Sequence, residues 1–342
     1  MKRTPSYAAQ FAFNQMLRVE KLRVHSSVLP RAFARIADRI VKPIAKKLGT
    51  NHIVDAKIYG HNMVMPAEHP LPVILATIPQ FNRPLGLAVE SIAATAVGDQ
   101  ELTVIDIGAN IGETVAIIEQ RIPGRCSYLC IEPEPEMSGL CRLNHSNNNR
   151  VQVEQVFIGE NEGALVWLED DGRANPSTKI VQEANPEKQP GCGCLKRLDT
   201  VALPFAELHG RVSLIKVDTE GYDFSVLRSG SQLLARYLPA IYLEWFPELL
   251  LGLNEQVWGG FDYLGTLGYH HLVFFTNQGD FYCSTSSPNR MFFQGLANIA
   301  TGNKAFPYFD VFLSTSESVC NELIERSIAQ NMKRVRSLTN HP

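Results

Sequence analysis

The stretch TVIDIGANIGET, residues 103–114, joins an apolar run to a helix-like pattern through two glycines. Val104 to Ile107 have the composition of a buried strand that is interrupted only by Asp106. Gly108 and Gly112 allow positive φ angles and a close approach of the backbone, either to a ligand or to a neighbouring helix. The stretch therefore predicts a strand, a tight turn and a helix. Whether the glycines approach a ligand or a neighbouring helix has to be inferred from the other segments of the sequence.

Strand-like and helix-like segments alternate after this point. The predicted strands are 103–107, 127–132, 151–157, 212–218 and 240–246, and the predicted helices are 113–121, 135–146, 223–236 and 254–267. A hairpin arm over 163–170, a polar loop over 171–194 and two closing strands near 270–276 and 280–283 complete the pattern. Such alternation predicts an α/β fold, namely a doubly wound, mostly parallel, seven-stranded Rossmann-like sheet.

The flanking segments predict three parts. Residues 1–98 are an N-terminal extension, 99–315 the catalytic domain and 316–342 a C-terminal helix and tail. The extension has an amphipathic helix pattern over 31–48, strand candidates at 53–58 and 72–78, and a helix at 85–97. The periodicity of 316–336 predicts a closing helix.

Composition excludes several classes of protein. The chain of 342 residues is 45% hydrophobic and 20% charged, with no apolar run as long as a membrane span. Its seven cysteines are scattered and predict reduced thiols in a cytoplasmic protein, and the pair Cys192 and Cys194 lacks a second pair at zinc-site spacing. No motif for nucleic-acid binding is visible, so we expect no nucleic-acid partner.

Charge is distributed unevenly along the chain. Residues 1–50 contain 11 lysines and arginines against Glu20 and Asp38, and the remainder is acidic. The basic segment 1–48 therefore predicts contact with an anionic surface. That surface is either a membrane, which makes the protein peripheral to it, or the protein's own acidic domain.

Acidic residues end four of the predicted strands. They are Asp106, Glu132, Asp218 with Glu220, and Glu244. Because ligands of doubly wound sheets bind beyond the carboxyl ends of the strands, these acids predict a cleft for a cationic, hydroxyl-rich ligand. Asp106 suits an ammonium group, and Glu132 suits the two hydroxyls of a ribose. The third glycine of a dinucleotide motif is missing, and the combination indicates S-adenosylmethionine. The predicted cofactor-binding residues are Asp106, Gly108, Ala109, Asn110, Gly112, Thr114, Glu132 and Phe157.

Several segments together resemble the FkbM-type methyltransferase family. They are VIDIGANIGET (104–114), CIEPEPE (130–136), RLDTVA (197–202), LIKVDTEGYDFSVLRSG (214–230) and IYLEWFPE (241–248). The resemblance covers roughly residues 100–285 and implies a class I methyltransferase fold. It also implies O-methylation, dependent on S-adenosylmethionine, of a sugar, glycolipid or natural-product hydroxyl. The loop 171–194 departs from the family pattern.

The catalytic residues predicted for such a reaction are Asp218, Glu220, Lys216 and Glu244. Asp218 is the first choice of base and Glu220 the second, while Glu244 positions the acceptor. Lys216 needs an acidic partner, either Asp218, Glu220 or Glu244, because a lysine in a buried strand is costly when unpaired. Asp223 is expected to cap the following helix.

Alternatives remain at this stage. His270 and His271 are the reserve candidates for the base. No metal site is predicted, although Asp218, Glu220 and Glu244 holding Mg²⁺ through waters is a variant of the same reaction. A nicotinamide-dependent oxidoreductase on the same sheet, and a methyltransferase fold kept for binding alone, are the two competing functions.

Overall fold

The structure, a computed structural model, describes residues 4–25, 52–96, 98, 100–169, 177–180, 193–303 and 305–339. They form two compact units, one of described residues up to Phe81 and one of described residues from Asn82 onward. The predicted helix over 31–48 and most of the loop 171–194 lie outside the described residues. Among the helices in the described ranges, none is long and apolar enough to cross a membrane.

The first unit combines a small sheet with helices. Its described elements are β1 (Thr4–Pro5), α1 (Tyr7–His25), β2 (His52–Ile58), β3 (His61–Pro66) and α3 (Leu71–Thr77). β2 pairs with β1 in parallel and with β3 in antiparallel fashion, and α1 packs on α3 and β2. The predicted strand at 53–58 is confirmed as β2. The strand predicted at 72–78 is wrong, because α3 occupies these residues with Pro72 in its first turn, where a helix needs no N–H donor.

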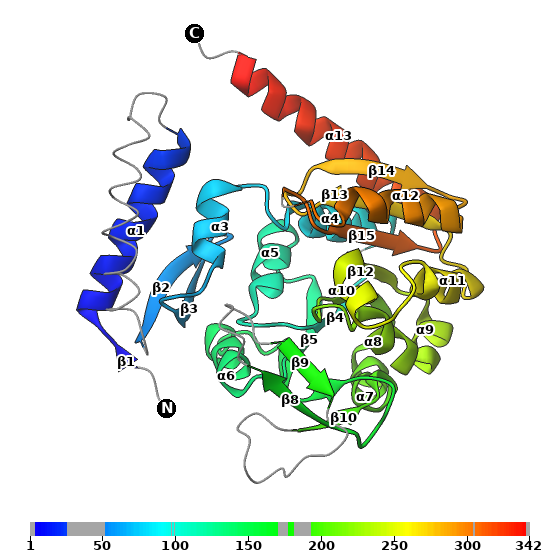
Figure 1. Ribbon diagram of the computed structural model, residues 1–342. Coiled ribbons are helices and arrows are strands. Elements are labelled where there is room, and N and C mark those ends of the chain that lie inside the picture. Colours follow the sequence, from blue (N-terminus) through cyan, green and yellow to red (C-terminus); the bar gives the residue numbers. More distant parts are fainter. Residues whose placement is uncertain are drawn as a thin grey trace. The chain divides into compact units, whose positions relative to one another are not determined.

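The second unit is built on an eight-stranded sheet with the strand order β14-β13-β15-β12-β11-β4-β5-β6 (Figure 1). Its strands are β4 (Leu102–Ile107), β5 (Cys126–Ile131), β6 (Val151–Glu154), β11 (Val212–Val217), β12 (Ala240–Trp245), β13 (His271–Thr276), β14 (Phe281–Thr285) and β15 (Phe309–Ser314). All are parallel except β14 and β15. The predicted doubly wound, mostly parallel α/β fold is confirmed.

The sheet has one strand more than the seven predicted. β15 inserts between β12 and β13, and the second of the two predicted closing strands, β14, becomes an extra edge strand. A smaller sheet of order β7-β10-β8-β9 lies beyond β6 in the chain. Its strands are β7 (Phe157–Ile158), β8 (Leu165–Glu169), β9 (Ser177–Ile180) and β10 (Gly193–Lys196).

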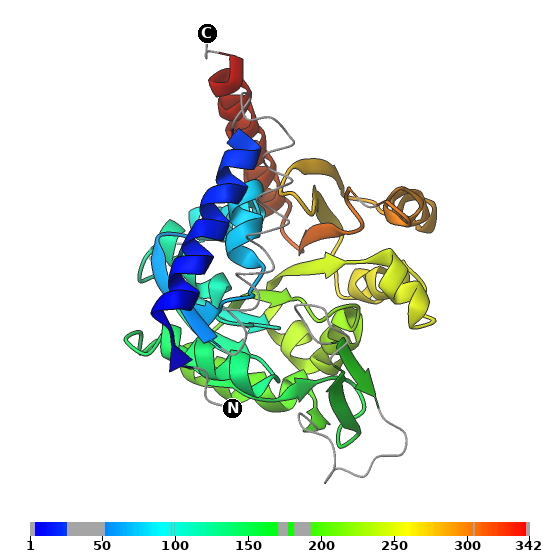
Figure 2. The same cartoon turned by 60° about the vertical axis from the view of Figure 1, so that its left-hand side comes forward.

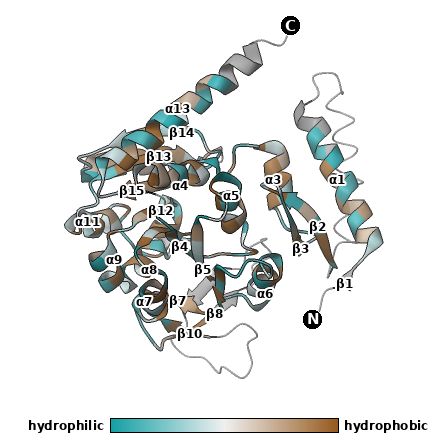
Figure 3. Cartoon of the chain, turned by 180° about the vertical axis from the view of Figure 1, so that it is seen from behind, coloured by the Kyte–Doolittle hydropathy of each residue, from teal (hydrophilic) through white to brown (hydrophobic). Residues whose placement is uncertain are grey.

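Helices cover both faces of the large sheet. They are α4 (Arg83–Thr95), α5 (Glu113–Arg121), α6 (Pro135–Asn144), α7 (Leu198–His209), α8 (Asp223–Ser229), α9 (Ser231–Tyr237), α10 (Pro247–Gly252), α11 (Gly259–Thr266), α12 (Arg290–Ala300) and α13 (Glu317–Thr339). Figure 2 shows strands β13 to β15 between α13 and α12. α13, the predicted closing helix, packs on α4, β13 and β15, and its coloured part in Figure 3 carries both hydrophilic and hydrophobic residues.

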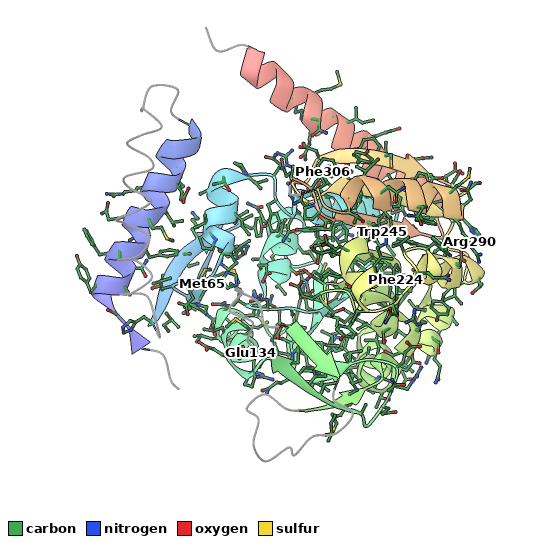
Figure 4. The ribbon with its side chains drawn as sticks, in the orientation of Figure 1. Met65, Glu134, Phe224, Trp245, Arg290 and Phe306 are labelled. Atoms are coloured by element: carbon green, nitrogen blue, oxygen red, sulfur yellow. The ribbon has the colours of Figure 1, made fainter. Side chains whose placement is uncertain are left out.

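One face of the sheet carries the main hydrophobic core. Trp245 and Phe224, labelled in Figure 4, are fully buried in it with Phe261 and Phe309. The indole N–H of Trp245 donates to the carbonyl of Val257 at 3.1 Å. Because side chains alternate along a strand, residues next to Trp245 and Phe309 point to the opposite face. That alternation places the polar residues of the same strands together.

Two predicted helices are interrupted. The helix expected over 223–236 is divided at Gly230 into α8 and α9, and a Cβ atom at that glycine would lie 2.8 Å from Leu198 Cδ2. The helix expected over 254–267 begins only at Gly259 as α11. Gly230 lies too close to Leu198 to carry a side chain, and a turn occupies the residues before Gly259, so neither predicted helix is continuous.

Candidate active site

The polar residues at the strand ends lie in rows across the sheet. Lys216 on β11 is in register with Asp106 on β4 and with Tyr242 on β12. In-register residues of neighbouring strands point to the same face, so these side chains share the face opposite the main core. Asp218 follows β11, and Glu244 near the end of β12 lies opposite Asp310 of β15. The sheet therefore gathers the predicted acids at one edge.

Lys216 connects two of these acids. Its side chain is buried, and Nζ lies 3.2 Å from Asp106 Oδ1 and 3.4 Å from Asp218 Oδ2. The same Nζ donates a hydrogen bond to the carbonyl of Gly108 at 3.2 Å. Burial lowers the pKa of Lys216, but the nearby carboxylates raise it more, so the net pKa is above its ordinary value. Lys216 remains a cation, and of its predicted partners Asp218 is confirmed.

Asp106 is the second partner of Lys216, which the sequence did not indicate. The side chain is fully buried on β4, and apart from its ion pair with Lys216 neither carboxyl oxygen has a well-formed hydrogen bond to a described residue. Burial raises the pKa of Asp106, while Lys216 and Thr114 lower it. A buried carboxyl with spare acceptor capacity costs free energy unless a ligand uses it. Asp106 therefore has the properties of a ligand-binding group.

The two glycines of the opening motif approach protein rather than empty space. Gly108 has a φ of +79°, and a Cβ atom there would overlap the backbone carbonyl of Asp218. Gly112 has a φ of +87°, and a Cβ atom would overlap the ring of His145. The loop is thus held between the end of β11 and the end of α6, and its contact with a cofactor stays a prediction.

Glu132 fixes this loop from the next strand. Its Oε2 accepts a hydrogen bond from the N–H of Asn110 at 2.8 Å, and its Oε1 accepts one from the N–H of Glu134 at 2.9 Å. Asn110 itself has a φ of +49°. Burial raises the pKa of Glu132 to about 7, although both N–H groups oppose the shift. The carboxyl is oriented in advance and still has acceptor capacity for a ligand.

The loop after β11 is held by Asp223. This residue was predicted to cap α8, but it is the first residue of the helix, and its carboxylate accepts hydrogen bonds from the N–H groups of Thr219 and Gly221 at 3.3 and 3.2 Å. The helix cap is therefore a wrong prediction, since the carboxylate turns back to the loop. Glu220 lies between these donors with a φ of +53°. This tight turn brings Glu220 close to Glu244, whose pKa burial and neighbouring acids raise well above the ordinary range.

Two acids of the site were not predicted from the sequence. Glu113, the first residue of α5, has a buried Oε2 without a hydrogen bond among the described residues, and burial raises its pKa to about 8. Asp310 on β15 is buried, and burial followed by the charge of Asp218 raises its pKa to about 7. Glu113 lies inside the quoted motif and could have been found there. Asp310 could not, because strand β15 itself was not predicted.

Other predicted residues lie apart from this cluster. Phe157 packs in a separate cluster with Val166 and Leu195 of the smaller sheet, so its contact with a cofactor stays a prediction. His270 and His271 line a hollow of about 660 Å³ at the start of β13. Since β13 runs parallel to β12, its start lies at the edge opposite the acids. The reserve role of these histidines as the base is therefore wrong. Within the described ranges no group of three or more His, Cys, Asp or Glu is arranged to hold a metal ion.

Comparison with known proteins identifies the family. Residues 106–279 match the family described as the methyltransferase FkbM domain, which is more than half of the 342-residue chain. The chain belongs to this family. The matched segment contains Asp106, Glu132, Lys216, Asp218 and Glu244, and it ends before β15. The resemblance noted in the sequence is confirmed. A search of curated proteins found no match.

The solved structures similar to this chain include proteins named as methyltransferases. A methyltransferase FkbM from Methylobacillus flagellatus KT is 13% identical with a TM-score of 0.40, and the match covers 88% of this chain and 58% of that one. The METTL16 methyltransferase domain is 12% identical with a TM-score of 0.39 and 76% and 75% coverage. The N-terminal domain of human METTL16 in complex with SAH is 12% identical with a TM-score of 0.36 and 76% and 77% coverage.

Proposed function

We propose that this FkbM methyltransferase uses S-adenosylmethionine to methylate a hydroxyl group of a sugar, glycolipid or natural-product acceptor. The observation that carries the proposal is Glu132, a buried carboxyl just after β5 that two backbone N–H groups hold in place with acceptor capacity left for a ligand. Asp106, a buried carboxyl paired with Lys216, lies at the end of the neighbouring strand β4. Membership of the family supports the same conclusion.

The residues present fit this cofactor. Asp106 would hold the ammonium group, the loop from Gly108 to Gly112 would contact the cofactor through its backbone, and Glu132 would accept hydrogen bonds from the ribose hydroxyls. Buried acids suit a ligand that carries positive charge and hydroxyl groups, whereas they would repel the pyrophosphate of a nicotinamide cofactor. When bound, the sulfonium supplies a methyl group that is already activated for transfer to oxygen.

The protein then has to position the acceptor hydroxyl and accept its proton. Asp218 is suited to the second task because its side chain is 45% exposed while Lys216 holds one of its oxygens. The Asp218 carboxylate would accept the proton of the acceptor hydroxyl as its oxygen takes up the methyl group that the cofactor supplies. Positioning contributes several kcal/mol to such a reaction, and a well-placed base typically adds about 10²–10⁴-fold. Glu220 is the second choice for the base.

Calorimetric titration tests the cofactor. The purified chain should bind S-adenosylhomocysteine and should not bind NAD. Binding of NAD alone would overturn the proposal in favour of an oxidoreductase. Comparing glycans and glycolipids of cells with and without the protein by mass spectrometry tests the acceptor, because each methyl transfer adds about 14 Da. Cofactor binding without any methylated product would indicate a binding protein.

A further inference from the structure

A second group of side chains lies at the acidic edge, on β12 and on β15, and the family match does not reach β15. Glu244 near the end of β12 and Asp310 near the start of β15 are opposite each other in the antiparallel pairing. Directly opposite residues of an antiparallel pair have their Cβ atoms roughly 5 Å apart and on the same face. β15 runs against its neighbours, so its first residues lie where the parallel strands end. Asp310 therefore lies at the same edge as the acids of the earlier strands.

Two aromatic rings lie beside this acid pair. Phe246 follows β12 and Tyr308 precedes β15, and their ring centroids are 5.6 Å apart with an interplanar angle of 36°. Both side chains are half-buried. The next residues inward, Trp245 and Phe309, stack in the main core on the other face. Alternation along the two strands therefore directs Phe246 and Tyr308 to the face that carries Glu244 and Asp310.

The charges at this position are almost all negative. Glu244 experiences the charges of Asp218, Glu220, Asp223 and Asp310, while Lys216 is a cation that acts on Asp310. Burial and the same acids raise the pKa of the Tyr308 hydroxyl well above its ordinary value, so this group stays an O–H donor. A phosphate or carboxylate would be repelled here. The carboxyl groups of Glu244 and Asp310 together offer four oxygens that accept hydrogen bonds from hydroxyl groups.

We propose that Glu244, Asp310 and Tyr308 form the binding site for the methyl acceptor, an uncharged ring with several neighbouring hydroxyl groups. The carboxyl pair and the tyrosine hydroxyl bind the acceptor hydroxyls, and the rings of Phe246 and Tyr308 pack against its apolar face. Aromatic side chains provide such a face while Tyr adds a polar group. This inference rests on the proposed function and adds the acceptor class and the residues that position it.

Saturation-transfer NMR with methyl glycosides of glucose, galactose, mannose and rhamnose tests the site, on the full chain saturated with S-adenosylhomocysteine. Glucose 6-phosphate and glucuronic acid are the charged counterparts. At least one neutral glycoside should bind, and both anions should fail. In Asp310→Asn the dissociation constant of that glycoside should rise about tenfold or more, since the amide offers one acceptor oxygen fewer than the carboxyl group. Tyr308→Phe should weaken binding in the same direction.

Controls separate this site from the cofactor site and from the fold. Asp262→Asn removes a carboxylate that pairs with Arg290 and lines the hollow at the opposite edge, so it should change nothing. The affinity for S-adenosylhomocysteine and the melting temperature should stay near the parental values in Asp310→Asn. The inference is overturned if no neutral glycoside binds the parent, or if Asp310→Asn and Tyr308→Phe bind it as tightly as the parent. If S-adenosylhomocysteine itself does not bind, the proposed function fails, and the glycoside titration without it still decides the acceptor site.

Discussion

At the residue scale, Glu132 has two tasks, whereas the nearby Glu134 has one. It holds the backbone of the motif loop through Asn110, and its carboxyl is the predicted partner of the ribose hydroxyls. The neighbouring Glu134 has a purely structural contact, since its Oε2 accepts the N–H of Met137 at the start of α6. Two acids two residues apart thus provide a matched pair for experiment.

Replacing Glu132 by Ala should weaken binding of S-adenosylhomocysteine about tenfold to a hundredfold, because a hydrogen-bonding partner of a polyhydroxyl ligand is lost. Isothermal titration calorimetry measures the change. Glu134→Ala should lower the melting temperature slightly through loss of a helix cap, with cofactor affinity unchanged. Equal affinity of Glu132→Ala and the parent would refute the assignment of the ribose.

The base is tested by amides that keep the shape of the side chain. Asp218→Asn and Glu220→Gln should each preserve cofactor affinity, and at least one should slow single-turnover methylation about a hundredfold or more. Lys216 keeps its contact with Asp106 in Asp218→Asn, so the fold should survive. Rapid-quench measurement with a saturating acceptor gives the rate. Near-parental rates in both variants would exclude the two acids as the base.

At the scale of elements, the end of β4 and the end of β11 touch through Gly108. Gly108→Ala should lower the free energy of unfolding by about 2 kcal/mol or more, because a positive φ and an overlap with the Asp218 carbonyl are both unfavourable to alanine. Gly139→Ala is the matched control. This glycine lies within α6, and an added Cβ atom would have no neighbour within 4 Å, so alanine should stabilise the helix by up to about 1 kcal/mol. Chemical denaturation compares the two, and an equal loss would contradict the close contact.

The sequence predicts the individual strands and helices better than it predicts which strands pair in the sheet. The motif around Asp106 was predictable because an apolar run and two glycines define a strand, a turn and a helix locally. The pairing of Asp106 with Lys216 depends on the register of two strands that are far apart in sequence. Asp310 was missed for the same reason, since only the sheet order shows that β15 enters between β12 and β13. Local patterns thus predict the cofactor side, and long-range pairing determines the rest.

At the scale of the whole molecule, several buried carboxyls make the folded state sensitive to pH. Burial raises the pKa of Glu113 to about 8 and of Glu132, Asp223 and Asp310 to about 7. In the unfolded chain these groups titrate near about pH 4. The folded state therefore binds protons more tightly, and its stability is greatest below the unfolded pKa and decreases as the pH rises through the folded pKa.

The free energy of unfolding should accordingly fall between about pH 5 and about pH 8. Each carboxyl that is protonated in the folded state and ionised in the unfolded state contributes up to about 1.4 kcal/mol per pH unit. Denaturant titrations at several pH values measure it. Asp310→Asn removes one of the groups and should make the dependence less steep. A stability that does not change with pH over this range would show that these carboxyls are ionised in the folded protein.

The basic N-terminal segment gives the last prediction. Helix α1 exposes Tyr7, Phe11 and Arg18, which lie on one helical face, together with the exposed Lys21. We propose that residues 1–48 contact an anionic membrane. The chain should sediment with phosphatidylglycerol vesicles at low salt and less at high salt, and Arg18→Glu with Lys21→Glu should weaken binding. If the chain does not sediment at low salt, the membrane contact is refuted, and the alternative is that the segment contacts the protein's own acidic surface.

The reversed direction of β15 allows donor and acceptor recognition to be altered independently. The acids proposed to hold the cofactor, Asp106 and Glu132, lie on or just after the early strands β4 and β5, whereas Asp310 and Tyr308 come from a later part of the chain. Exchanging the segment that ends in β15 between two family members would then transplant substrate choice and leave the donor half untouched. In protein engineering this makes a single contiguous cassette the natural unit for redesign.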